Sequence, residues 1–143
     1  MLIKQISVFL ENKPGRMNRV TQLLRDASID LKAATIADTE EFGILRIIVA
    51  EPEKALAVLK ENDFFARTTN VLAVVVDDTP GGLNQVLEVF AQKNISVEYL
   101  YSMVQAGPKG AVIIVRVKDS HHAVELLQGS NITIIPGEEL FAL

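Results

Sequence analysis

The sequence has no cysteine and only two histidines, the adjacent His121 and His122. Without cysteine there can be no disulfides, thiolate metal ligands or cysteine nucleophiles. The two histidines have no further ligand nearby at a metal-binding spacing, and such a pair in the first turn of an expected helix is typical of a solvated surface. The phosphate loop G-x-x-x-x-G-K is also missing. We therefore expect no metal site and no cofactor.

Long apolar runs and an excess of positive charge are missing too. No apolar run approaches the roughly 20 residues that a membrane-spanning helix needs, and the N-terminus lacks the basic and apolar regions of a signal peptide. The 14 basic residues are outnumbered by 18 acidic ones, which gives a net charge of −4. Phosphate backbones favour clustered Lys and Arg. We expect a cytoplasmic protein with neither a membrane nor a nucleic-acid partner.

No group of residues with catalytic spacing stands out. The Ser and Thr residues have no histidine partner in a matching position, because both histidines fall on an expected outer helix. The paired acids at 40–41 and 138–139 lie in an expected turn and in the tail, where solvation explains them better than acid–base chemistry. We do not expect an enzyme.

The sequence does contain an internal repeat, which should be sought before any fold is assigned. Pro14 and Pro80 are 66 positions apart. The same offset pairs Gly15 with Gly81, Asn18 with Asn84, Val20 with Val86, and Ile29 with Ile95. Further along, Gly43 matches Gly110 at 67, and Ala55 and Leu59 match Ala123 and Leu127 at 68. We predict two domains, residues 1–69 and 70–143, joined by the short linker Thr69-Asn70.

Hydrophobic periodicity predicts the same order of elements in each half. In the first half we expect strands at 2–10, 31–38, 43–50 and 64–68, helices from Met17 and Pro52, and a polar turn at 39–41. In the second half we expect strands at 71–76, 96–104, 111–117 and 132–135, helices from Leu83 and Asp119, a turn at 105–110, and an apolar tail at 138–143 that docks on the protein. The order β-α-β-β-α-β gives an antiparallel sheet with two helices on one face, so the predicted class is α+β with two ferredoxin-like units. Each half buries little core alone and leaves sheet edges open. We expect the halves to pack together, and two chains to form a homodimer.

Two Pro-Gly segments connect the first strand of each half to its first helix. We call residues 11–17 the first corner and residues 77–83 the second corner. Gly allows a sharp turn and a close approach to the main chain, and a helix N-terminus presents free N–H groups that suit an anion. Each corner is therefore either a ligand loop or a plain strand-to-helix turn that binds nothing.

The two corners differ in charge. Lys13, Arg16 and Arg19 crowd the start of a helix, where cations oppose the helix dipole by roughly 0.3–1 kcal/mol each. They either hold a carboxylate or are surface charges that pair with Glu11 and other acids. The second corner has Asp77 and Asp78 instead, which either take an ammonium group or cap the helix. If both corners bind, a zwitterion suits the pair.

The Pro-Gly corner followed by an amphipathic helix within a β-α-β-β-α-β unit resembles the ACT domain. The matching segments are residues 11–17 and 77–83, and the strands at 43–49 and 110–117 are also similar to the third strand of that family. The resemblance covers nearly the whole chain twice and implies a stand-alone tandem ACT protein that senses a small metabolite, most often an amino acid, and acts on a separate metabolic enzyme or regulator.

The resemblance also implies where the ligand lies, namely where two ACT units meet. The corner of one unit supplies N–H groups and a polar side chain, and the second strand of a neighbour closes the pocket. Carried over by position, the corner residues are Asn12, Lys13, Gly15, Arg16 and Met17, and Asp78, Thr79, Gly81, Gly82 and Leu83. The strand residues are Thr35, Ile36 and Ala37, and Tyr101, Ser102 and Met103. Gly82 stands where the first corner has Arg16, so the two sites need not bind the same ligand.

Two other functions remain open. One is a hydrolase on a ferredoxin-like fold, similar to acylphosphatases, for which Arg16 and Asn18 are the nearest candidates to hold a phosphate. The other is a structural assembly module whose corners stay empty.

Overall fold

The computed structural model describes residues 1–38, 40–103 and 110–143. Thr39 of the expected first turn, Val104 of the expected strand 96–104 and most of the expected turn at 105–110 lie outside the described residues. The chain divides into two compact units. The N-terminal unit is residues 4–69, and the C-terminal unit is residues 70–143 together with residues 1–3.

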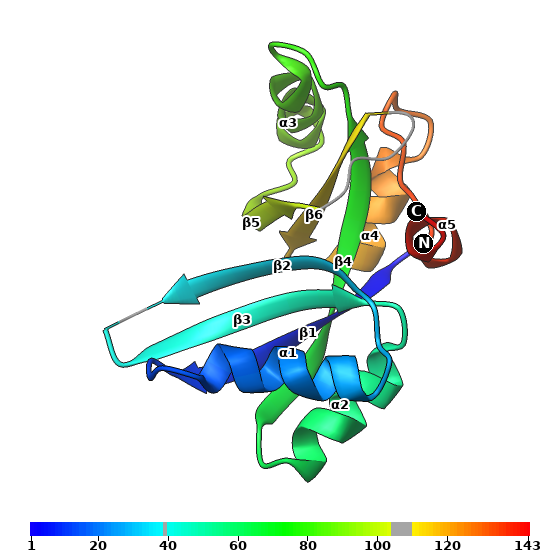
Figure 1. The fold of residues 1–143 in the computed structure, drawn as a ribbon. Helices are drawn as coiled ribbons and strands as arrows, with labels where there is room; N and C mark the ends of the chain where they lie inside the picture. The colour runs from blue at the N-terminus through cyan, green and yellow to red at the C-terminus, as the bar shows by residue number, and fades with distance from the viewer. Residues whose placement is uncertain (39, 104–109) are drawn as a thin grey trace. The chain divides into compact units, whose positions relative to one another are not determined.

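The N-terminal unit contains four strands and two helices. These are β1 (Ile3–Glu11), α1 (Arg16–Asp26), β2 (Leu31–Asp38), β3 (Phe42–Val49), α2 (Pro52–Glu61) and the first part of β4 (Phe65–Val76). The strand order is β2-β3-β1-β4, and β3 pairs antiparallel with both β1 and β2. Both helices lie on one face of this sheet (Figure 1). The order and layers predicted from periodicity are confirmed.

Alternation along β1 explains the core of this unit. Ile6, Val8 and Leu10 are buried on the face that packs against the helices. The helices contribute Val20, Leu23 and Leu24 from α1, and Ala55 and Leu59 from α2. Apolar residues three or four apart on a helix share one face, so each helix covers the sheet with a single stripe.

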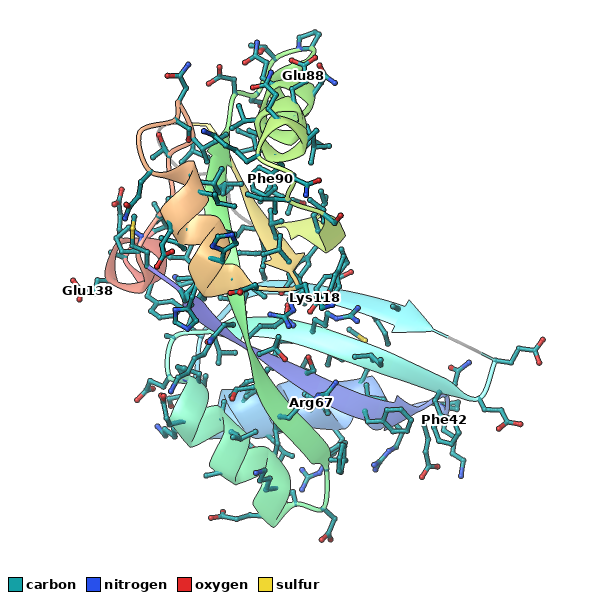
Figure 2. All side chains as sticks on the ribbon, turned by 180° about the vertical axis from the view of Figure 1, so that it is seen from behind. Phe42, Arg67, Glu88, Phe90, Lys118 and Glu138 are labelled. Carbon is teal, nitrogen blue, oxygen red and sulfur yellow. The ribbon has the colours of Figure 1, made fainter. Side chains whose placement is uncertain are left out.

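The C-terminal unit repeats this plan. It contains the second part of β4, then α3 (Gly82–Gln92), β5 (Val97–Ser102), β6 (Ala111–Val117), α4 (Ser120–Leu127) and α5 (Gly137–Phe141). The order is β4-β6-β5, with both neighbouring pairs antiparallel. Its core joins Val74 of β4, Phe90 of α3 and Leu127 of α4. Figure 2 shows Phe90 and Glu88 on α3, of which Phe90 is buried and Glu88 is exposed.

Two expectations were wrong. Thr69-Asn70 is not a linker, because both residues lie inside β4, which runs without interruption from Phe65 to Val76. Residues 132–135 do not form a full strand. They make one antiparallel bridge between Val74 and Ile134, with backbone bonds of 3.0 Å from Val75 N to Thr133 O and 2.8 Å from Ile135 N to Ala73 O. Pro136 follows directly and has no N–H, so the ladder stops there.

The second helix of each unit starts where proline and aspartate in the sequence predict a helix start. Helix α2 begins at Pro52, and the carboxylate of Asp119 caps α4 by accepting a bond of 3.0 Å from His122 N. The tail forms α5, in which Leu140 is fully buried, and it belongs to the C-terminal unit. None of the described helices has the length and apolar character needed to cross a membrane.

Candidate functional site

The first corner turns the chain from β1 into α1 at Gly15. Gly15 has φ +86°, a left-handed conformation that favours glycine, and its carbonyl accepts the first helical bond, from Arg19 N at 2.9 Å. A Cβ added at Gly15 would meet no atom within 4 Å. Glycine is therefore needed here for its φ, and the space beside it is open.

Internal hydrogen bonds fix the residues that lead into this turn. Asn12 donates from its main-chain N to Glu41 O at 2.8 Å and from Nδ2 to Glu40 O at 3.2 Å. Lys13 pairs with Glu11, with 2.9 Å between Nζ and Oε2. Asn12 thus ties the first corner to the turn between β2 and β3, while Lys13 folds back onto the end of β1.

Arg16 and Arg19 both reach toward the segment between α2 and β4. The Arg16 guanidinium lies over the ring of Phe64, 4.6 Å from its centroid, and its Nε is buried with no partner among the described residues. Arg19 donates to Asn62 Oδ1 at 3.4 Å and to Gln22 Oε1 at 3.1 Å. Sequence reasoning missed the contact between Arg16 and Phe64, because no local pattern indicates a contact between residues so far apart in the chain.

The cations of the first corner also act on Glu11. The hydrogen bond and charge of Lys13, and more weakly the charge of Arg16, hold the pKa of the Glu11 carboxyl below its ordinary value. Lys13, Arg16 and Arg19 therefore all have partners within the unit. Apart from the buried Nε of Arg16, the donors left over at the first corner are main-chain groups.

Those donors include the N–H groups of Met17 and Asn18, in the first turn of α1. Among the described residues neither has an acceptor, no side chain caps the helix, and no acid lies in its first turn. The first N–H groups of a helix have no partner within the helix and carry a partial positive charge. The first corner can therefore accept an anion at its main chain.

The second corner has nearly the same backbone. Gly81 has φ +85°, Gly82 N donates to Thr79 O at 3.0 Å, and Gln85 N donates to Gly81 O at 3.0 Å. The N–H groups of Leu83 and Asn84 likewise have no acceptor among the described residues. The two corners thus offer the same main-chain donors.

The structure explains why Gly82 replaces the arginine of the first corner. A Cβ on Gly82 would lie 2.0 Å from the carbonyl oxygen of Asp77, so this tighter turn admits no side chain. The interpretation of Asp77 and Asp78 as caps was wrong, because α3 begins at Gly82 with Gly81 as its N-cap and with no side-chain cap bond. No hydrogen bond or ion pair joins either carboxylate to another described residue. Both acids are therefore available to a ligand.

The strand residues of the expected site lie apart from the corner of their own unit. Thr35, Ile36 and Ala37 are on the edge strand β2, and β3 separates them from β1. In the C-terminal unit Tyr101 is on the edge strand β5, paired with Ile114. Met103 lies just beyond β5 and donates to Val112 O at 3.0 Å. Tyr101 and Met103 are buried and Ser102 is exposed.

One exposed aromatic pair was also missed. The rings of Phe9 and Phe42 stack with their centroids 5.0 Å apart, and the residues are 46% and 39% exposed. Phe42 lies at the start of β3, at the end of the sheet in Figure 2. One indication of this pair was present in the sequence, because Phe9 is an apolar residue on the strand face that otherwise carries the polar Ser7 and Glu11.

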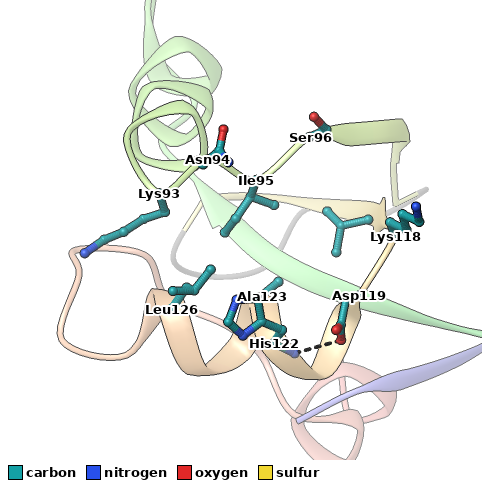
Figure 3. Close-up of a pocket in the computed structure, with 10 residues that line it drawn as sticks. Lys93, Asn94, Ile95, Ser96, Lys118, Asp119, His122, Ala123 and Leu126 are labelled. Carbon is teal, nitrogen blue, oxygen red and sulfur yellow. Dashed lines mark hydrogen bonds between the residues drawn. The ribbon is translucent and has the colours of Figure 1, made fainter.

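Two cavities lined by described residues lie in the C-terminal unit. One of them, of about 440 Å³, lies between the end of α3 and the start of α4 (Figure 3). Lys93 and His122 line it from the two sides, and Asp119 caps α4 beside it. At the matching place of the N-terminal unit, Lys54 Nζ donates to Ala27 O at 2.8 Å and joins the two helices. In the C-terminal unit these positions hold Lys93 and His122, and no such hydrogen bond joins them among the described residues.

The smaller cavity, of about 290 Å³, lies against the second corner. We call it the Asp77 cavity. It is lined by Asp77 and Gly82 of the second corner, by one side of α3 from Gln85 to Val89, and by residues 131–133. Among the described residues no group of three His, Asp or Glu side chains has an arrangement that could hold a metal ion.

Comparison with known proteins agrees with this architecture. The family model described as an ACT domain pair matches residues 1–143. Protein BT0572 from Bacteroides thetaiotaomicron, of known crystal structure, is 36% identical, with a TM-score of 0.92 over 100% of this chain and 98% of that chain. A search of curated proteins found no match.

More distant solved structures share the fold. The ligand-free regulatory subunit of aspartate kinase from Thermus thermophilus is 18% identical, with a TM-score of 0.64 over 89% of this chain and 90% of that chain. The corresponding subunit from Thermus flavus is 16% identical, with a TM-score of 0.60 over 87% and 88%. The match of the family model over the whole length, together with the repeated corner and helix, shows that this chain belongs to the family of ACT domain pairs.

Proposed function

We propose that this protein is a regulatory protein that binds an amino acid at its Pro-Gly corners and acts on a separate metabolic enzyme or regulator. The observation that carries the proposal is the set of free main-chain donors. At both corners a left-handed glycine precedes a helix whose second and third residues have N–H groups without an acceptor among the described residues. A carboxylate satisfies such donors with charge-assisted hydrogen bonds, which are about twice as strong as neutral ones.

The second corner supplies the complementary charge. Asp77 and Asp78 carry no ion pair with any described residue and can accept an ammonium group. An amino acid carries both a carboxylate and an ammonium group. The proposal also includes the site implied by the family resemblance, in which the ligand lies where ACT units meet and the strand residues 35–37 or 101–103 of a neighbouring unit close the pocket.

A non-catalytic role fits these features. Arg16, which with Asn18 is the nearest candidate to hold a phosphate, has its guanidinium over the ring of Phe64. The Thermus proteins with this fold are regulatory subunits of aspartate kinase. By analogy we propose that the signal here passes through a change in assembly, with a homodimer as the basic state.

A thermal-unfolding screen of the twenty amino acids tests the proposal. A ligand that binds only the folded state adds RT ln(1 + [L]/Kd), about 2.7 kcal/mol at 100 times Kd, so a true ligand gives a shift that grows with concentration. Sedimentation of the protein with and without that ligand then tests the change in assembly. If no amino acid gives a concentration-dependent shift, the proposal is wrong.

A further inference from the structure

The second corner differs from the first by the loss of every cation. At the offset of 66 that relates the two corners, Lys13, Arg16 and Arg19 correspond to Thr79, Gly82 and Gln85. The acid at the end of the strand is kept, because Glu11 corresponds to Asp77. The first corner neutralises its acid internally, whereas the second corner has an acid and no described residue that neutralises it.

Because the second corner has glycine in place of Arg16, it also has an open space where the first corner has a side chain. In the N-terminal unit the Arg16 guanidinium covers Phe64. Helices α2 and α4 begin at Pro52 and Ser120, so an offset of 68 relates this part of the two units. At that offset, Phe64 of the N-terminal unit corresponds to Ile132 of the C-terminal unit. In the C-terminal unit the corresponding place, between Gly82 and Ile132, is the Asp77 cavity. Its volume of about 290 Å³ is near the lower limit of small-molecule sites.

The lining of this cavity suits a cation on an apolar stem. Asp77 is the only charged residue among the described residues that line it. Val86, Val89 and Ile132 supply buried or half-buried apolar surface. Methylene groups and the flat face of a guanidinium pack on such a surface while the charge meets a carboxylate, as long basic side chains do within proteins.

We propose that the Asp77 cavity binds the guanidinium or ammonium group of a small basic molecule, such as the side chain of a basic amino acid. The bound cation takes the place that Arg16 occupies in the N-terminal unit. This inference rests on the proposed function and narrows it, because it gives the second corner a basic ligand.

The test is an NMR titration of the full chain, following the main-chain amides. The probes are L-arginine, its neutral isostere L-citrulline, and n-propylguanidine, which has the cation but no carboxylate. We expect L-arginine and n-propylguanidine to shift the amides of Asp77, Gly82, Gln85 and Ile132. We expect L-citrulline to bind at least about tenfold more weakly, a difference of roughly 1.4 kcal/mol.

Two isosteric variants provide the control. Asp77→Asn removes the charge that lines the cavity and should weaken binding of L-arginine at least about tenfold. Glu88→Gln removes an equal charge from the exposed side of α3, outside both the cavity and the second corner, and should change the affinity less than about threefold. Equal binding of L-arginine and L-citrulline, or equal effects of the two variants, would overturn the inference.

The two proposals can fail separately. If the thermal screen finds a neutral or acidic ligand while n-propylguanidine shifts nothing, this inference is wrong and the proposed function stands. If no amino acid binds but n-propylguanidine shifts the amides of the cavity and Asp77→Asn abolishes the shift, the cation site stands and the amino-acid function is wrong.

Discussion

Replacing Asn18 by aspartate probes the free donors of the first corner directly. Asn18 is exposed and lies in the first turn of α1, where no acid and no side-chain cap are present. Asn18→Asp changes the shape of the side chain very little and adds a negative charge next to unpaired N–H groups. The variant should therefore stabilise the helix and compete with any bound carboxylate.

The size of the effect follows from the helix dipole. An acid in the first turn at an exposed site contributes about 0.3–1 kcal/mol. With an m-value of about 2 kcal/mol per M, the midpoint of urea unfolding should rise by roughly 0.15–0.5 M. If an amino acid binds the first corner through its carboxylate, its affinity for the variant should fall, because the new carboxylate and the ligand would compete for the same donors.

The control adds the same charge at the opposite end of a helix. Gln92 is the last residue of α3, which has neither an acid in its first turn nor a base in its last turn. Gln92→Glu should lower the free energy of unfolding by a similar amount, since the C-terminal end of a helix carries a partial negative charge. If Asn18→Asp and Gln92→Glu shift the midpoint in the same direction, the account of the free donors of α1 is wrong.

Three further results are expected. Leu59 is fully buried in the core of the N-terminal unit, so Leu59→Ala should cost about 2–5 kcal/mol in urea unfolding; a cost below 1 kcal/mol would contradict that core. Gly82→Ala should cost about 1–3 kcal/mol, because its Cβ cannot lie 2.0 Å from Asp77 O without a shift of the main chain; an unchanged stability would show that the corner is not so tight. The Lys4 ammonium lies 2.6 Å from the Glu53 carboxylate, and its hydrogen bond lowers the pKa of Glu53 below 4.5. This pair therefore stabilises the protein above about pH 4.5. Its contribution is lost as the pH falls through the lowered pKa. Lys4→Met should consequently lose less stability than the wild-type protein between about pH 5 and pH 3, as followed by urea unfolding, and identical pH profiles would refute this.

Local rules accounted for most of the fold. The strand at 31–38 and the helix starting at Pro52 occur at the positions predicted from periodicity and proline. Where the prediction was wrong, non-local pairing decided the outcome. Thr69 and Asn70 are polar and resemble a linker, yet they lie inside the continuous ladder of β4. Residues 132–135 have strand-like composition, but Pro136 leaves them too short to form more than a bridge.

The candidate site was less predictable than the fold. The position of both corners and their left-handed glycines follow from the Pro-Gly signal. The partners of the side chains do not, because Arg16 meets Phe64 and Asn12 meets the turn before β3 only once the unit has folded. The steric reason for Gly82, a carbonyl 2.0 Å from its missing Cβ, is likewise a property of the folded turn.

The central claim is that the Pro-Gly corners bind an amino acid through their free main-chain N–H groups. The most direct measurement is an NMR spectrum of the ¹⁵N-labelled full chain with each of the twenty amino acids in turn. The account predicts that at least one of them shifts the amide signals of Met17 and Asn18, or of Leu83 and Asn84, in a saturable way. Saturable binding that leaves all four signals unchanged, or no binding by any amino acid, would contradict it.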